Sequence, residues 1–89
     1  MGEAEIRQKI KEIIANVTNL PVAEIPDDAR FREDLDLDSL SLLEIGVDVD
    51  YEFRLGLPDG ELQKIGGLDD AVALALQIIA ERGGRSAVA

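Results

Sequence analysis

The sequence contains no cysteine and no histidine, and its aromatic residues are limited to one tyrosine and two phenylalanines. Without thiolate or imidazole ligands, a zinc site of the usual kind cannot form, and no histidine is available for a catalytic triad. A serine without a neighbouring base is a poor nucleophile, because nothing assists the removal of its proton. The composition therefore predicts a protein that is not an enzyme and has no metal site. With no cysteine there are no disulfides, which favours the cytoplasm.

Long apolar runs are also missing from the sequence. No segment approaches the ~20 apolar residues that a membrane-spanning helix needs. Residues 1–13 carry charges throughout and lack the apolar stretch of a signal peptide. We therefore expect a cytoplasmic protein without a membrane span. No feature of the sequence indicates oligomerisation, so we expect a monomer.

The residues that are present suffice for one small folded domain. Of the 89 residues, 46% are hydrophobic and 31% are charged, which is typical of a globular rather than a disordered chain. Since aromatic residues are scarce, the core has to be built from Ile, Leu, Val and Ala. We expect one domain over residues 1–82, followed by a flexible tail over residues 83–89.

The net charge of −10 is concentrated in one segment of the chain. Residues 33–52 contain eight acidic and no basic residues, whereas the segments before and after them are nearly balanced. Such a surface repels nucleic acid and anionic lipid, and it favours protein partners that present Lys and Arg. The charge distribution therefore predicts partners with basic patches and no nucleic-acid binding.

Apolar residues recur at helical spacing in three segments, which predicts helices over about residues 3–17, 39–53 and 68–82. Asp38 is expected to cap the second helix, and Asp69 or a nearby residue the third. A turn at residues 58–60 precedes a segment that is long enough for only a short helical turn, residues 61–65. No alternating strand pattern competes. The expected fold is all-α: a four-helix bundle with three longer helices and one short one.

A long loop is expected between the first two helices, over about residues 18–37. Pro21 and Pro26 prevent the first helix from continuing. Apolar residues recur along the loop and are expected to hold it against the core: Leu20, Val22, Ile25, Phe31, Leu35 and Leu37.

The predicted second helix has two apolar faces. At ~100° per residue, one face forms an ordinary core stripe of Leu42, Ile45, Gly46, Val49 and Phe53. The nearly opposite face carries a second stripe, here named the outer stripe, which comprises Leu40, Leu43, Val47 and Tyr51 and is followed by Arg54. Glu44, Asp48 and Asp50 flank it. An exposed apolar stripe with an acidic border is typical of a docking surface. Alternatively, the loop at residues 18–37 folds back and covers it.

Ser39 lies at the start of this helix, within the most acidic part of the chain. From its position alone, it can simply be a first-turn helix residue. Phosphorylation is disfavoured because the neighbouring aspartates repel added negative charge. The D-x-D-x-D pattern that begins at Asp34 matches the opening of a calcium loop. However, Ser39 replaces the glycine required at the sixth position, and Ile45 replaces the glutamate required at the twelfth.

Several motifs together resemble the acyl carrier proteins, the phosphopantetheine-bearing modules of fatty acid and polyketide synthesis. Asp38-Ser39-Leu40 matches the family's core motif at the start of its second helix. "F-x-E-D-L" at residues 31–35 precedes it at the family's spacing, Glu44 follows five residues after the serine, and Phe53 ends the helix. "LPDGELQKI" matches the family's segment around its short third helix. The resemblance covers about residues 3–81.

The resemblance implies a specific modification of Ser39. A phosphopantetheinyl transferase, using coenzyme A and magnesium, attaches a 4′-phosphopantetheine arm to this hydroxyl through a phosphodiester. The terminal thiol of the arm then carries acyl groups as thioesters to the enzymes of fatty acid or polyketide biosynthesis. Family contacts and the outer stripe together give the candidate partner-binding residues: Asp38, Leu40, Leu43, Glu44, Val47 and Asp48.

Several positions depart from the family pattern, and alternatives to acyl carriage stay open. Gly46 replaces a larger apolar residue, and Ser41 replaces a residue that is often acidic. Asp48 and Asp50 add charge around the outer stripe, and these changes together leave the identity of the partner enzymes open. An aminoacyl carrier of the D-alanyl type shares the Asp-Ser-Leu core, whereas the motif of peptidyl carriers differs. An unmodified helical adaptor that binds through the outer stripe is the remaining alternative.

Overall fold

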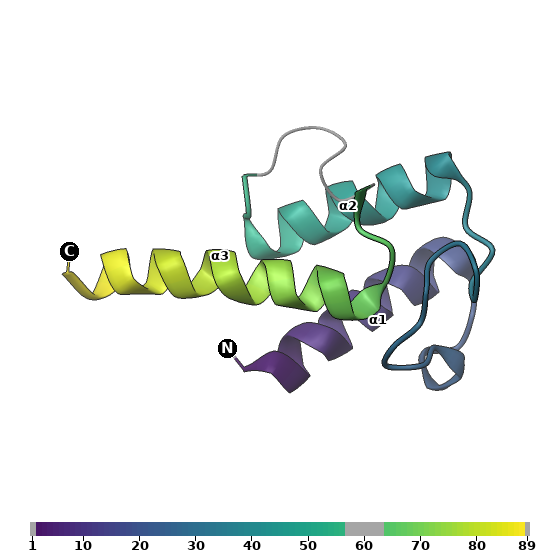
Figure 1. Cartoon of the computed structure of the whole chain (residues 1–89), viewed down its shortest axis with the longest axis horizontal. Coiled ribbons are helices and arrows are strands. Elements are labelled where there is room, and N and C mark those ends of the chain that lie inside the picture. Colours follow the sequence, from purple (N-terminus) through teal and green to yellow (C-terminus); the bar gives the residue numbers. More distant parts are fainter. Residues whose placement is uncertain (1, 57–63, 89) are drawn as a thin grey trace.

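The computed structural model describes residues 2–56 and 64–88, with side chains as far as residue 81. It contains three α-helices, α1 (Glu3–Thr18), α2 (Ser39–Phe53) and α3 (Leu68–Val88), and a short 3₁₀ helix, η1 (Val22–Glu24), within the loop between α1 and α2 (Figure 1). Among the described residues there is no β-strand, only one isolated bridge. The predicted all-α class is confirmed.

The helix boundaries follow the predicted ones closely. α1 ends one residue later than expected, at Thr18, where Asn19 adopts a left-handed conformation (φ 63°) and its amide donates to the carbonyl of Ala15. α2 begins and ends where its apolar periodicity and its cap predicted. The short helical turn predicted at residues 61–65 lies mostly outside the described residues. The backbone of α3 continues to Val88, beyond the predicted end at residue 82.

α1 is the central helix, because it packs against both α2 and α3 (Figure 1). Ile6, Ile10 and Ile14 are fully buried and form one face of α1 at a spacing of four residues, which aligns them along one stripe. The buried side chains of α2 and α3 close over this stripe: Leu42, Ile45, Val49 and Phe53 from α2, and Leu68, Ala71, Val72 and Ala75 from α3. The core is mostly aliphatic, as the composition predicted.

The loop between α1 and α2 is held against the core by five of the six apolar residues predicted to do so; the exception is Val22, which begins η1 and is only half-buried. Ile25, Phe31 and Leu37 are buried, while Leu20 and Leu35 are half-buried and pack against them. η1 supplies local order near the start of the loop. The residues that lead into α2 therefore follow a path fixed by burial.

Backbone hydrogen bonds tie the second half of this loop to the start of α3. The amide of Phe31 donates to the carbonyl of Gly66 at 2.9 Å, and the amide of Leu68 donates to the carbonyl of Ala29 at 2.9 Å. These bonds flank an antiparallel bridge between Arg30 and Gly67. A Cβ atom on Gly67 would lie 2.8 Å from the Ala29 carbonyl oxygen, so this close approach requires glycine.

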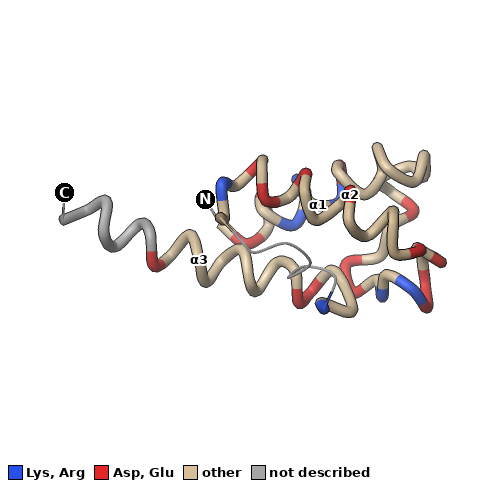
Figure 2. The backbone as a smooth tube through the Cα atoms, turned by 90° about the horizontal axis from the view of Figure 1, so that it is seen from above, with Lys and Arg blue, Asp and Glu red and all other residues tan. Residues whose placement is uncertain are grey.

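Arg7 joins three elements on the outside of the core. Its guanidinium donates to the carboxylate of Asp69 on α3 and to the carbonyl of Asp27 in the loop, both at 2.6 Å. Lys11 pairs with the Asp27 carboxylate. Figure 2 shows basic and acidic residues together along α1. Since α3 begins at Leu68, Asp69 lies inside its first turn and is not its N-cap; its carboxylate binds Arg7 instead.

In the part of the chain that the structure describes, no helix has the length and apolarity needed to cross a bilayer.

Candidate functional site

Ser39 is the first residue of α2, and its side chain is exposed. The Oγ atom of Ser39 accepts a hydrogen bond from Nη2 of Arg32 at 3.3 Å. Arg32 lies in the loop, seven residues earlier, and its own side chain is exposed. The site therefore presents a hydroxyl at a helix start with a guanidinium beside it.

Asp38 is the N-cap of α2, as predicted. Its Oδ1 accepts a hydrogen bond from the backbone amide of Ser41 at 2.8 Å, which satisfies one of the free donors of the first turn. The pKa of Asp38 is lowered, chiefly by this backbone hydrogen bond, with contributions from the Ser41 hydroxyl and from the Leu40 amide. The carboxylate thus stays charged and holds the helix start on which Ser39 sits.

The alternating aspartates before Ser39 have separate structural tasks. Oδ2 of Asp34 accepts from the backbone amide of Arg30 at 2.7 Å, and Asp36 adopts a left-handed conformation with φ 53°, which aspartate tolerates better than most residues. Asp38 caps α2. The leucines between them turn toward the core, since Leu37 is buried and Leu35 half-buried. Two of these three carboxylates accept from backbone amides, and the described residues contain no metal-binding cluster of acidic side chains.

The outer stripe of α2 is exposed to solvent. The exposed fractions are 65% for Leu40, 41% for Leu43, 59% for Val47 and 86% for Tyr51. The alternative that the loop covers this face is therefore wrong, because the loop's apolar residues pack on the core instead. The acidic members of the candidate partner-binding set are also exposed: Asp38, Glu44 and Asp48.

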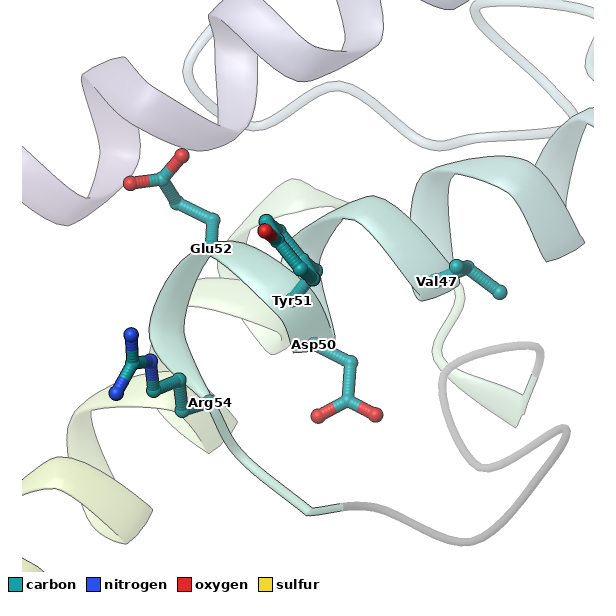
Figure 3. A pocket seen from close by; sticks show the side chains of 5 residues that line it. All are labelled: Val47, Asp50, Tyr51, Glu52 and Arg54. Carbon is teal, nitrogen blue, oxygen red and sulfur yellow. The ribbon is translucent and has the colours of Figure 1, made fainter.

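An open hollow lies at the C-terminal end of α2, lined by Val47, Asp50, Tyr51, Glu52 and Arg54 (Figure 3). Its polar side chains point in different directions in Figure 3. The carboxylate of Asp50 accepts from the amide of Gly56 at 2.7 Å, and Glu52 pairs with Lys9 of α1 at 3.8 Å. These groups hold the end of α2, so they do not converge on a ligand.

Arg32 is the residue at this site that the sequence analysis missed. It is the last basic residue before the acidic segment at residues 33–52, which is the one signal in the sequence that singles it out. Its contact with Ser39 depends on the path of the loop between them, and sequence periodicity does not describe that path.

The chemistry of the site suits a phosphate ester on Ser39. The hydroxyl is accessible to another protein, and the adjacent guanidinium is a donor well matched to phosphate oxygens. The described residues around Ser39 offer carboxylates and a guanidinium but no neutral nitrogen base.

Comparison with known proteins agrees with this chemistry. Residues 8–75 match the family described as a phosphopantetheine attachment site. The chain is 40% identical over 72 residues to an acyl carrier protein of Rubrobacter xylanophilus, which covers 81% of this chain and 89% of that one. It is 43% identical over 68 residues to polyketide-8 synthase acyl carrier protein 2 of Streptomyces avermitilis, and this match covers 76% of this chain and 78% of that one.

A solved structure also resembles the fold. The acyl carrier protein of Enterococcus faecalis superposes with a TM-score of 0.68 at 27% identity, and the match covers 86% of this chain and 98% of that one.

Proposed function

The chain belongs to the family of phosphopantetheine-bearing acyl carrier proteins, and we propose that Ser39 is the residue to which its arm is attached. The protein is a carrier and not an enzyme: it holds acyl groups on a covalent 4′-phosphopantetheine and interacts with synthase-type enzymes. The observation that supports Ser39 is its exposed hydroxyl at the start of α2, with a cationic donor 3.3 Å from the oxygen.

A phosphopantetheinyl transferase performs the attachment, with coenzyme A as donor and magnesium as cofactor. In that step a bond forms between Ser39 Oγ and the phosphorus that carries pantetheine, and the pyrophosphate bond of coenzyme A breaks. Adenosine 3′,5′-bisphosphate leaves, and the serine proton passes to a base of the transferase. Because the transferase supplies the base, Ser39 needs only to be reachable.

The partner-binding surface is the outer stripe with its acidic border. Leu40, Leu43 and Val47 offer apolar contacts, and Asp38, Glu44 and Asp48 offer negative charge. This combination fits enzymes of fatty acid or polyketide biosynthesis that present basic docking patches, because opposite charges steer the encounter and apolar anchors hold the complex. The protein acts in the cytoplasm as a monomer.

The attachment site is tested by intact mass spectrometry. The protein is incubated with coenzyme A, magnesium and a broad-specificity phosphopantetheinyl transferase, and the wild type is expected to gain one phosphopantetheine. Ser39→Ala is expected to gain none. Ser41→Ala is the matched control, because Ser41 lies two residues away on the same helix, and it is expected to be modified like the wild type. Modification of Ser39→Ala, or no modification of folded wild-type protein, would contradict the proposal.

A further inference from the structure

We propose that Arg32 is the phosphate-binding residue of this carrier, pairing with the phosphodiester on Ser39 after the arm is attached. The inference rests on the proposed attachment to Ser39. It starts from a contact already present without the arm, the hydrogen bond from Arg32 Nη2 to Ser39 Oγ at 3.3 Å.

The N-terminus of α2 has fewer free backbone amides for a phosphate on Ser39 than a helix start normally provides. A helix N-terminus normally stabilises an anion through its free amides. In this protein the carboxylate of Asp38 already accepts from the Ser41 amide at 2.8 Å and interacts with the Leu40 amide. A phosphate on Ser39 would therefore have to compete with a carboxylate for these donors.

The charges around Ser39 make a cationic partner for the phosphate important. The phosphodiester adds a negative charge within the segment of residues 33–52, which contains no basic residue. Asp34, Asp36 and Asp38 precede the serine and are all exposed. These carboxylates and the phosphate carry charge of the same sign, so they repel each other, and salt screens that repulsion only in part. A cation next to Oγ offsets this repulsion at the point where the new charge appears.

Arg32 is available for this role. In the described part of the chain no carboxylate lies within ion-pair distance of its guanidinium, whereas Arg7 and Arg30 both pair with carboxylates. The nearby Arg30 is held by Glu33 at 3.2 Å. Since the phosphorus bonds directly to Oγ, its oxygens lie on the atom that Arg32 already contacts. The planar guanidinium can then donate to them as a charge-assisted pair.

The deciding experiment follows the arginine side chains by NMR in the wild-type protein before and after modification. The Nε–Hε resonance of Arg32 is expected to shift, and its exchange with water to slow, when the arm is attached. Both changes should shrink in 0.5 M salt. Arg30 is the internal control, because its partner Glu33 does not change. An Arg32 resonance that does not move on modification overturns the proposal, and attachment to Ser39 would still stand.

A thermal comparison of variants gives the size of the effect. For wild type, Arg32→Gln, Arg32→Lys and Lys9→Gln, the melting temperature is measured with and without the arm. In Arg32→Gln the arm is expected to lower the melting temperature by about 2–4 °C more than in wild type. In Arg32→Lys the arm should lower the melting temperature by an amount between those for wild type and Arg32→Gln, because lysine keeps the positive charge. Lys9→Gln removes a charge that pairs at the opposite end of α2, and it should behave like wild type. Equal changes in wild type and Arg32→Gln would also overturn the proposal.

Discussion

The two faces of α2 are both apolar, yet only one of them is buried. Leu42, Ile45, Val49 and Phe53 have exposed fractions of 6% or less, whereas members of the outer stripe are exposed by 41% or more. The difference does not come from the side chains, since leucine and valine occur on both faces. It comes from what the rest of the chain places against each face. α1 covers one, and the loop that could have covered the other packs on the core instead.

The comparison teaches that apolar periodicity alone does not decide burial, since the outer stripe stays exposed where the described residues place nothing against it. The outer stripe lowers the solubility of the free protein, and the acidic residues around it offset that effect.

The strongest test of the comparison places the same carboxylate on each face. Val49→Glu is expected to lose about 3–5 kcal/mol of unfolding free energy, enough to abolish a cooperative transition in a small domain, because the charge is buried without a partner. Val47→Glu, two residues earlier on the exposed face, should change stability by no more than about 0.5 kcal/mol. Urea unfolding followed by circular dichroism measures both. Equal losses for the two variants would mean that the outer stripe is core.

Adjacent leucines provide a milder version of the same test. Leu42 is 3% exposed and Leu43 is 41% exposed. Leu42→Ala should cost about 2–5 kcal/mol, because it leaves a cavity in the core. Leu43→Ala should cost less than about 1 kcal/mol, because its side chain is partly in water already. The midpoints of thermal unfolding rank the two variants, and a larger loss for Leu43→Ala would reverse the assignment of the faces.

Substitutions in the outer stripe of α2 should change acyl transfer rather than stability. In the arm-bearing protein, Leu40→Glu and Val47→Glu are expected to lower the rate of acyl transfer with a partner enzyme by about tenfold, which corresponds to roughly 1.4 kcal/mol. The inserted carboxylate has to be desolvated where an apolar contact was made. Transfer is measured by mass spectrometry of the acylated carrier, with helicity recorded in parallel. Unchanged transfer with unchanged helicity would exclude these residues from the docking surface.

The smallest expected effect is on the pH dependence of stability, and it concerns Asp38, the N-cap of α2. The pKa of Asp38 is lower in the folded state than in an unfolded chain, so its contribution to stability is present at neutral pH. That contribution is lost as the pH falls below about 4 and the carboxylate is protonated. Asp38→Asn keeps a capping side chain but cannot titrate, so its stability should fall less steeply with acid.

Asp38→Ala is the contrasting variant for this measurement. It removes the cap as well as the charge, and it is expected to be less stable than Asp38→Asn at every pH. The unfolding free energy is measured against pH for each variant. If it falls equally steeply below about pH 4 in the wild type and in Asp38→Asn, Asp38 does not contribute to the pH dependence of stability.

The sequence predicted most of the fold because its main elements are marked locally. Helical periodicity and the Asp38 cap located α2, and the prolines marked the end of α1. The burial of loop residues such as Phe31 was also predictable, because a loop rich in apolar residues needs a surface to cover. Of the cap residues expected for α3, Asp69 itself is excluded, because the helix already begins at Leu68; the hydrogen bond from the Leu68 amide to the Ala29 carbonyl at this point is a long-range contact that local sequence does not reveal.

The site was predicted only in part. Position and family resemblance led to the proposal of Ser39 with its apolar and acidic neighbours, and the structure places these side chains on the exposed side of α2. Whether the outer stripe was exposed could not be decided, since both faces of α2 have similar composition. The contact between Arg32 and Ser39 could not be predicted either. The loop between the two residues passes through Asp36, where φ is 53°, and helical periodicity does not describe such a path.

The hydrogen bonds that fasten the loop to the start of α3 have a consequence for delivery. An acyl group on a flexible arm can reach any point within the length of that arm, and the centre of the volume that it reaches is the attachment point of the arm. With the arm on Ser39 as proposed, that centre lies at the end of a loop fastened to the start of α3, because the Phe31 amide donates to the Gly66 carbonyl and the Leu68 amide donates to the Ala29 carbonyl. The reach of the acyl group from that centre is set by the arm, and each receiving enzyme has to bring its entrance within that radius.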